Sequence, residues 1–201
     1  MTAKFQHMPI TLATKITIAR ILGIPVFILV LIYYKMSLVA GDPVDWYRLL
    51  ALGLFIVIAA TDALDGYLAR KRDEESRLGA VLDPIADKAL LLSAIILLTR
   101  PSVEVLWPQF PVSFTLLIIS RDVVLVLGSY LIHWMTGHVE VRPRITGKIA
   151  TFLQMTAIVT ALIPLAPIFY PVVFLAGFFT FVSGLQYIID GARQLERAEP
   201  A

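Results

Sequence analysis

The chain has 201 residues, of which 58% are hydrophobic and only 16% are charged, and its formal net charge is +2. Soluble domains are typically about half apolar and a quarter charged, so this composition indicates an integral membrane protein. The mild charge argues against a nucleic-acid partner, and the absence of cysteine excludes disulfides and thiolate chemistry.

Apolar stretches long enough to cross a bilayer recur along the whole chain. Six helices are predicted, over residues 16–36, 48–70, 83–99, 112–135, 146–163 and 168–193. Turn-forming residues separate them, as at Gly41-Asp42-Pro43 and at Pro164. We therefore expect one all-α membrane domain over residues 1–201, with a short interfacial N-terminal segment that is not a cleaved signal. In the last helix, Gly177 and Gly184 would permit close helix contact or face lipid.

The basic residues predict the orientation of these helices, because cytoplasmic loops carry most of the lysine and arginine of membrane proteins. With the N-terminus inside, twelve lie on the cytoplasmic side: Lys4, Lys15, Arg20, Arg70, Lys71, Arg72, Arg77, Arg142, Arg144, Lys148, Arg193 and Arg197. Three lie on the opposite side: Lys35, Arg48 and Arg100. Both termini are therefore expected on the cytoplasmic side of a cytoplasmic membrane.

Four aspartates lie at the borders of the second and third apolar stretches, in the segment TDALDGYLARKRDEESRLGAVLDPIADK. Asp62 and Asp65 are three positions apart, and Asp83 and Asp87 are four apart, so each pair shares one face of its helix. Consecutive helices can run antiparallel, and the four carboxylates would then converge. Pro84 after Asp83 also predicts that the third helix begins here, with Asp83 as its cap.

A cluster of this kind needs protons or bound cations, because ionised carboxylates repel one another. Oxygen donors without histidine or cysteine favour Mg²⁺, Mn²⁺ or Ca²⁺ over zinc, and four carboxylates suit two ions, which we expect to be Mg²⁺ or Mn²⁺. The neighbouring Gly66, Ala69 and Gly79 are small and leave room for a ligand. A proton- or cation-coupled transporter would use the same acids and remains the alternative from another functional class.

These residues together form a longer pattern: Asp62-x-x-Asp65-Gly66-x-x-Ala69-Arg70, eight residues, then Gly79-x-x-x-Asp83-x-x-x-Asp87. It resembles the signature of the CDP-alcohol phosphotransferases. The resemblance implies a homodimeric membrane enzyme that binds CDP-diacylglycerol, transfers its phosphatidyl group to an alcohol and releases CMP. It implies that Asp87 is the general base and that the metal ligands are Asp62, Asp65, Asp83 and Asp87. The implied contacts of the CDP group are Asp62, Gly66, Ala69, Arg70 and Gly79.

A basic group around the fifth helix suggests an acceptor that carries phosphate, because guanidinium groups bind phosphate through paired hydrogen bonds. Its members are Arg121, Arg142, Arg144 and Lys148. Arg142 and Arg144 are equally consistent with ordinary flanking charge. Arg121 lies inside a predicted span and therefore requires a partner, either Asp122 or the site itself.

Two further stretches bear on the acceptor. TKITIARILGIPVFILV, with Thr17 and Arg20, resembles the opening of the phosphatidylglycerophosphate synthases of this family, which use glycerol 3-phosphate, and RITGKIATFLQM is similar to another stretch of that group. Thr14 departs from the asparagine common there, and ISRDVVL is closer to the cardiolipin synthases, which use phosphatidylglycerol. The sequence therefore predicts metal-dependent phosphatidyl transfer to glycerol 3-phosphate, with cardiolipin synthesis as the alternative.

Overall fold

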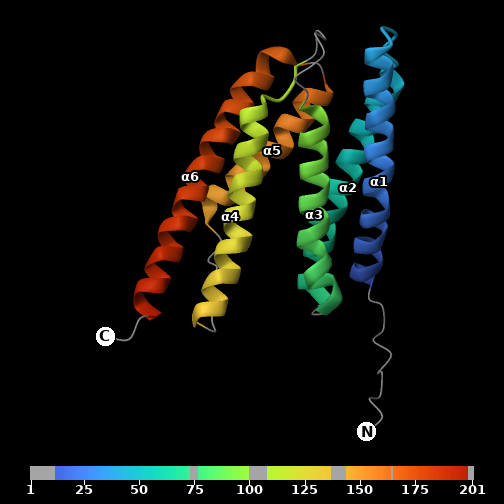
Figure 1. Cartoon of the computed structure of the whole chain (residues 1–201). Helices are drawn as coiled ribbons and strands as arrows, with labels where there is room; N and C mark the ends of the chain where they lie inside the picture. Colours follow the sequence, from blue (N-terminus) through green and yellow to red (C-terminus); the bar gives the residue numbers. More distant parts are fainter. Residues whose placement is uncertain (1–11, 73–76, 100–107, 137–143, 164, 199–201) are drawn as a thin grey trace. The chain divides into compact units, whose positions relative to one another are not determined.

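The computed structural model describes residues 12–72, 77–99, 108–136, 144–163 and 165–198, and all of its regular structure is helical. The helices are α1 (Leu12–Val39), α2 (Asp45–Arg72), α3 (Arg77–Leu98), α4 (Val112–Thr136), α5 (Ile145–Leu162) and α6 (Ala166–Ala198) (Figure 1). The prediction of six helices is confirmed, and the predicted boundaries of five of them differ by at most five residues. The proposed interfacial segment lies outside the described residues, apart from the first residues of α1.

The predicted start of the third helix is wrong. α3 begins at Arg77, and Pro84 lies inside it, so Asp83 is not a helix cap. Proline removes a single amide donor from the helix. Ending a helix inside an apolar environment would leave several backbone groups without partners, which costs more. One continuous helix therefore carries both Asp83 and Asp87.

The chain divides into two compact units, Met1–Ser93 and Ala94–Ala201. In the first unit, α1 packs against α2. The ring of Phe27 lies 5.9 Å from that of Phe55, and Gly23 leaves room for the side chain of Ile58. Gly41 turns the chain between the two helices with a φ of 80°, which only glycine adopts without strain.

In the second unit, α6 packs against both α4 and α5. α5 is antiparallel to α6, because Arg144 at its start bonds Asp190 while Gln154 further along bonds Thr180. α4 runs parallel to α6, since Gly177 lies against Phe114 and Gly191 lies against Ile132. α6 is therefore the central helix of this three-helix unit. The contact of Gly177 with α4 also means that this glycine permits close helix approach within the chain.

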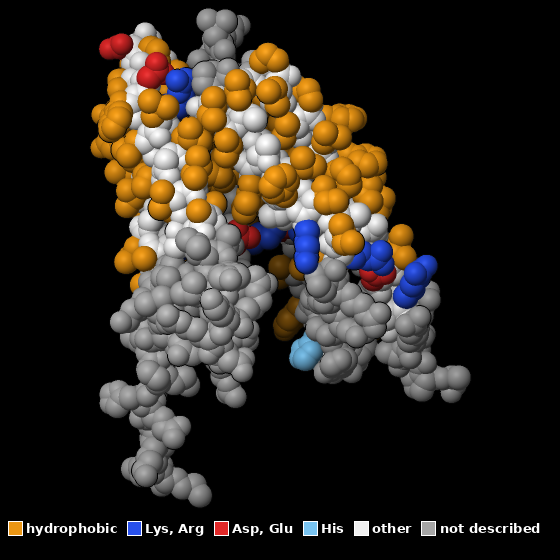
Figure 2. All heavy atoms as spheres, turned by 180° about the vertical axis from the view of Figure 1, so that it is seen from behind, with side chains coloured by type: hydrophobic (Ala, Val, Ile, Leu, Met, Phe, Trp, Pro, Cys, Tyr) orange, Lys and Arg blue, Asp and Glu red, His pale blue; other side chains and the backbone are white. Residues whose placement is uncertain are grey.

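Among the residues that the structure describes, four helices are long and apolar enough to cross a membrane: Thr17–Val39 of α1, Val112–Met135 of α4, Ile145–Leu162 of α5 and Pro167–Leu195 of α6. α2 and α3 each contain a stretch whose side chains lie outside the described residues. Figure 2 shows hydrophobic side chains over most of the described surface on one face, with charged side chains confined to a few places. A surface of this kind suits contact with lipid, and the chain is a membrane protein.

Candidate functional site

The acidic pattern falls on the two helices that the sequence predicted. α2 carries its first half and α3 its second half. The side chains of Asp62, Asp65, Gly66, Ala69, Arg70, Gly79 and Asp83 lie outside the described residues. The side chain of Asp87 is described, and it is partly exposed on α3. The expected convergence of the four carboxylates therefore stays a prediction.

The helical backbone meets one condition of that prediction. Both aspartate pairs lie within continuous helices, so the three- and four-residue spacings place each pair on one face. Among the side chains that the structure describes, no three histidine, cysteine, aspartate or glutamate residues form a metal-binding group. The donor set in the pattern consists of carboxylates alone, which suits a hard divalent cation such as Mg²⁺ or Mn²⁺.

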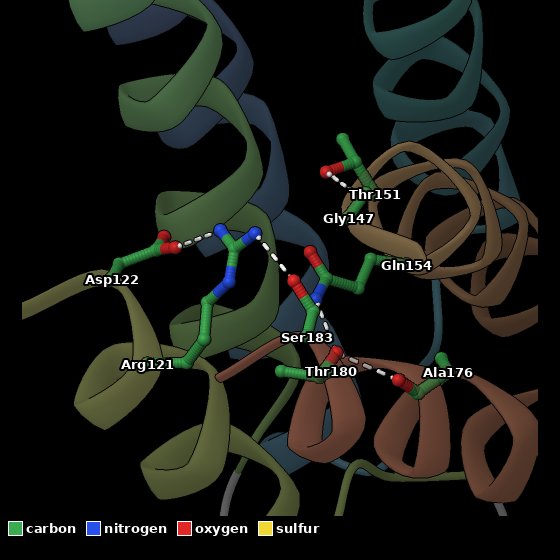
Figure 3. Close-up of polar contacts among 8 residues, drawn as sticks. All are labelled: Arg121, Asp122, Gly147, Thr151, Gln154, Ala176, Thr180 and Ser183. Carbon is green, nitrogen blue, oxygen red and sulfur yellow. Dashed lines mark hydrogen bonds and ion pairs between the residues drawn. The ribbon is translucent and has the colours of Figure 1, made fainter. Parts of the chain in front are cut away.

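Of the described residues in the predicted acceptor site, Arg121 from α4 has the least exposed side chain. Its Nη1 donates to the Oδ1 of Asp122 at 2.8 Å, and its Nη2 donates to the Oγ of Ser183 at 3.1 Å (Figure 3). Its guanidinium carbon lies 5.2 Å from the ring centroid of Tyr187. Only 10% of the Arg121 side chain and 14% of the Asp122 side chain are exposed. Of the two partners expected from sequence, Asp122 is the one that the structure shows.

Two glycines make space for this side chain. A Cβ atom at Gly147 of α5 would lie 3.1 Å from Nη2 of Arg121 and 3.3 Å from the Oγ of Ser183. A Cβ atom at Gly184 of α6 would lie 3.4 Å from Cγ of Arg121. The arginine therefore passes between two helices at points where neither has a side chain. Gly184 faces Arg121, which agrees with the expected close approach and not with a lipid-facing position.

Arg144 lies just before α5 and forms a paired interaction with α6. Its Nε donates to Oδ2 of Asp190 at 2.8 Å, and its Nη2 donates to Oδ1 at 2.6 Å. Both carboxylate oxygens are therefore held by one guanidinium, the strong two-point geometry of arginine. Lys148, one turn along α5, is exposed, and Arg142 lies outside the described residues.

Four polar contacts follow one another along the side of α6 that faces α4 and α5. We call them the polar ladder: Arg144–Asp190, Thr146–Gln186, Arg121–Ser183 and Gln154–Thr180. Sequence reasoning missed its members on α6. Their spacing of three or four residues within an apolar helix marks one helical face, and this signal could have revealed them.

Thr17 and Arg20, which carry part of the family resemblance, lie in the first unit. Both are buried in α1, with 1% and 3% of their surface exposed. Neither side chain therefore lies on the surface of α1. A buried arginine in a membrane helix indicates a functional or structural partner nearby.

Comparison with known proteins points to the same family that the acidic pattern of α2 and α3 resembles. Residues 10–184 match the sequence profile of a family described as CDP-alcohol phosphatidyltransferase. A CDP-diacylglycerol–glycerol-3-phosphate 3-phosphatidyltransferase of Bacillus subtilis (strain 168) is 34% identical over 196 residues, covering 88% of this chain and 92% of the relative. A protein of the same description from Pseudomonas fluorescens is 36% identical over 185 residues, covering 86% of each chain. One from Escherichia coli (strain K12) is 34% identical over 154 residues, with 75% and 76% covered.

Proposed function

Because the chain belongs to the CDP-alcohol phosphatidyltransferase family, we propose that it transfers the phosphatidyl group of CDP-diacylglycerol to glycerol 3-phosphate. The observation that carries this proposal is the similarity to relatives described by that reaction over most of their length. The three relatives described above, from Bacillus subtilis, Pseudomonas fluorescens and Escherichia coli, are each at least 34% identical to this chain. The reaction belongs to phospholipid biosynthesis, and a membrane protein is suited to its lipid substrate.

The chemistry exchanges one phosphorus–oxygen bond for another. The acceptor hydroxyl attacks the phosphorus that bears diacylglycerol, the bond from that phosphorus to CMP breaks, and CMP leaves with the bonding electrons. Asp87 is proposed to take the hydroxyl proton, and its partial exposure on α3 is compatible with this role. Asp62, Gly66, Ala69, Arg70 and Gly79 are proposed to contact the CDP group.

Two divalent cations, Mg²⁺ or Mn²⁺, are proposed to bind Asp62, Asp65, Asp83 and Asp87. When bound, such ions neutralise charge on the phosphates and on the departing CMP. The support comes from the all-carboxylate donor set and from the helical placement of both aspartate pairs. The residues of the chain hold the ions, orient the CDP group and accept the proton.

The phosphate of the acceptor is proposed to bind beside Arg121 and the start of α5. Helix α5 has no side-chain cap on its first amides, so its N-terminal end favours an anion. Gly147 of this first turn lies directly against the Arg121 guanidinium. Lys148 is exposed and adds positive charge. Arg144 is engaged by Asp190, whose carboxylate offsets its charge, so its proposed contribution is smaller than that of Arg142, which would add positive charge.

The excess of basic residues in one set of loops supports a cytoplasmic active site, with both termini on the same side. A homodimer is proposed on the family resemblance. Crosslinking of the purified protein in bilayer nanodiscs would trap a species of twice the chain mass if the dimer forms.

The acceptor assay offers CDP-diacylglycerol to the purified protein with glycerol 3-phosphate, phosphatidylglycerol or inositol phosphate, and measures CMP. We expect release with glycerol 3-phosphate and its loss in EDTA, restored by Mg²⁺ or Mn²⁺. Release with phosphatidylglycerol alone would identify the cardiolipin reaction instead. Gradient-driven uptake into vesicles without any CMP release would point to the transporter alternative.

The second experiment replaces Asp87 by Asn, which removes the proposed base and one metal ligand. Turnover should fall by a factor of about 10³ or more, the scale of general-base catalysis. The matched control is Asp45→Asn. Asp45 is an exposed aspartate at the start of α2, whereas Asp62 and Asp65 of the acidic pattern lie near the end of that helix. Both variants should keep the thermal unfolding temperature of the parent. Undiminished turnover in the Asp87 variant would exclude its role as base.

A further inference from the structure

The side chain of Arg121 is contacted by Asp122 of its own helix and by two residues of a different helix, Ser183 and Tyr187. We propose that Ser183 and Tyr187 of α6 are positioning residues, which aim the Arg121 guanidinium at the phosphate of the acceptor. This inference rests on the proposed function and adds two residues that the acceptor need not touch. Ser183 is fully buried and Tyr187 is partly buried.

The contacts fix the guanidinium plane at two points. One terminal nitrogen is bound by Asp122 from the same helix, and the other is bound by Ser183 from α6. The ring of Tyr187 lies within the distance at which an aromatic face attracts a cation. A guanidinium has five N–H donors, so two hydrogen bonds leave donors available for a ligand.

Purely structural packing explains this arrangement poorly. The Nε atom of Arg121 is buried and has no hydrogen-bond partner among the described residues. An unsatisfied buried donor lowers stability, and an apolar side chain would join the three helices without that cost. A ligand-binding role accounts for keeping a charged group in this position.

Orientation matters here because the charges of Arg121 and Asp122 nearly cancel each other. Asp122 lies 2.8 Å from Nη1, so at longer range its negative charge offsets the field of Arg121. The pair therefore attracts a phosphate through directed N–H donors more than through its net charge. A small rotation of the guanidinium would misdirect those donors, and Ser183 and Tyr187 prevent that rotation.

Two glycines also help to define the position of the Arg121 side chain. Gly147 and Gly184 leave open the space through which the arginine reaches α5 and α6. A Cβ atom at Gly147 would crowd Nη2 and the Ser183 hydroxyl at the same time. Gly147 lies against the guanidinium and Gly184 against the aliphatic part of the Arg121 side chain, and the hydroxyl of Ser183 accepts a hydrogen bond from Nη2.

The test compares Ser183→Ala with Thr180→Val in the CMP-release assay. Ser183→Ala removes the hydrogen bond to Arg121, whereas Thr180→Val, one turn away on α6, removes the bonds of Thr180 to Gln154 and to the carbonyl of Ala176 and none to Arg121. Losing a hydrogen bond to a charged group should raise the KM for glycerol 3-phosphate about tenfold in Ser183→Ala. The KM for CDP-diacylglycerol should change less than about twofold on the same scale. Thr180→Val should leave both KM values at those of the parent.

Tyr187 supplies an independent pair of variants. Tyr187→Phe keeps the aromatic face beneath the guanidinium and should retain the parent KM for glycerol 3-phosphate. Tyr187→Leu removes that face and should raise the same KM severalfold. These variants decide the matter even if Ser183→Ala fails to fold. Equal kinetics for Phe and Leu would overturn the role of Tyr187.

A double-mutant cycle separates positioning from general packing. If Ser183 acts only through Arg121, Arg121→Ala/Ser183→Ala should have the same KM for glycerol 3-phosphate as Arg121→Ala alone. Additive effects, or an unchanged KM in Ser183→Ala, would overturn the inference while the parent enzyme still releases CMP. A parent protein that releases no CMP with any acceptor would instead refute the proposed function.

Discussion

The two ends of the α4–α5–α6 unit are built from different kinds of contact. At the end where α4 and α6 begin, the rings of Phe110, Phe114 and Phe169 pack with centroids 5.3 and 5.1 Å apart. At the other end, the polar ladder connects α4, α5 and α6 through hydrogen bonds and ion pairs. Aromatic packing would join the helices at either end, so the polar contacts need a further explanation.

The comparison suggests that one end of the α4–α5–α6 unit serves stability and the other end serves ligand binding. At the aromatic end the three rings are buried, with at most 5% of each residue exposed. The ladder end places an arginine, an exposed lysine and the start of α5 around one region. Polar groups in membrane helices lower stability when unpaired and commonly mark functional sites. The following predictions test whether function and stability separate between the two ends in this way.

The largest effect is expected from Arg121→Leu. This change removes the guanidinium from Asp122, whose side chain is only 14% exposed, and breaking such a pair typically costs about 3–5 kcal/mol. Thermal unfolding in detergent should therefore move to a lower temperature, and the KM for glycerol 3-phosphate should rise about 100-fold while CMP release stays measurable. In Arg121→Leu/Asp122→Asn, stability should partly return while that KM stays raised. Recovery of both together would mean that the arginine serves packing alone.

A smaller effect is expected from adding a methyl group at one glycine of each end. Gly147→Ala would place its Cβ 3.1 Å from Arg121, whereas Gly177→Ala would meet Phe114 at an ordinary 3.6 Å. We expect Gly147→Ala to raise the KM for glycerol 3-phosphate about fivefold, a shift of about 1 kcal/mol. Gly177→Ala should keep that KM and gain up to about 1 kcal/mol of helix stability. Indistinguishable KM values for the two variants would erase the proposed contrast between the ends.

The smallest effect is expected from Gln154→Leu, which removes the deepest contact of the polar ladder. Thr180 keeps its hydrogen bond to the carbonyl of Ala176, so no hydroxyl is left unsatisfied. Hydrogen bonds between membrane helices average about 0.6 kcal/mol, and thermal unfolding should shift only slightly. Activity should match the parent. A large loss of activity would extend the acceptor site further along α5 than proposed.

Hydropathy was sufficient to predict the six helices, because a lipid-facing helix must be apolar around most of its surface. The same property hides which face meets a neighbour, and this explains why Ser183, Tyr187 and Asp190 were not predicted. Asp122 was predicted as a partner of Arg121 because it is adjacent in sequence. Pro84 misled the prediction, since proline favours a first helical turn but is also tolerated inside membrane helices.

The acidic pattern illustrates the opposite case. Its aspartates were singled out by their spacing, their roles were implied by the family resemblance, and they lie on the helices that were expected. Whether the two aspartate pairs meet depends on how α2 and α3 are placed, which periodicity within a helix does not determine. Arg144 shows a similar dependence, because its pairing with Asp190 requires the start of α5 to lie beside the end of α6.

The length of α6 gives the ladder a gradient of depth. Its 33 residues extend about 50 Å, well beyond the roughly 30 Å of hydrocarbon in a bilayer. Thr180 lies about 15 Å along the axis from Asp190, and exposure falls over that distance from 28% of the Asp190 side chain to none for Thr180. Dissolved ions can screen the Arg144–Asp190 pair but not the contacts beneath it. Rising ionic strength should therefore loosen the start of α5 while the rest of the bundle stays closed.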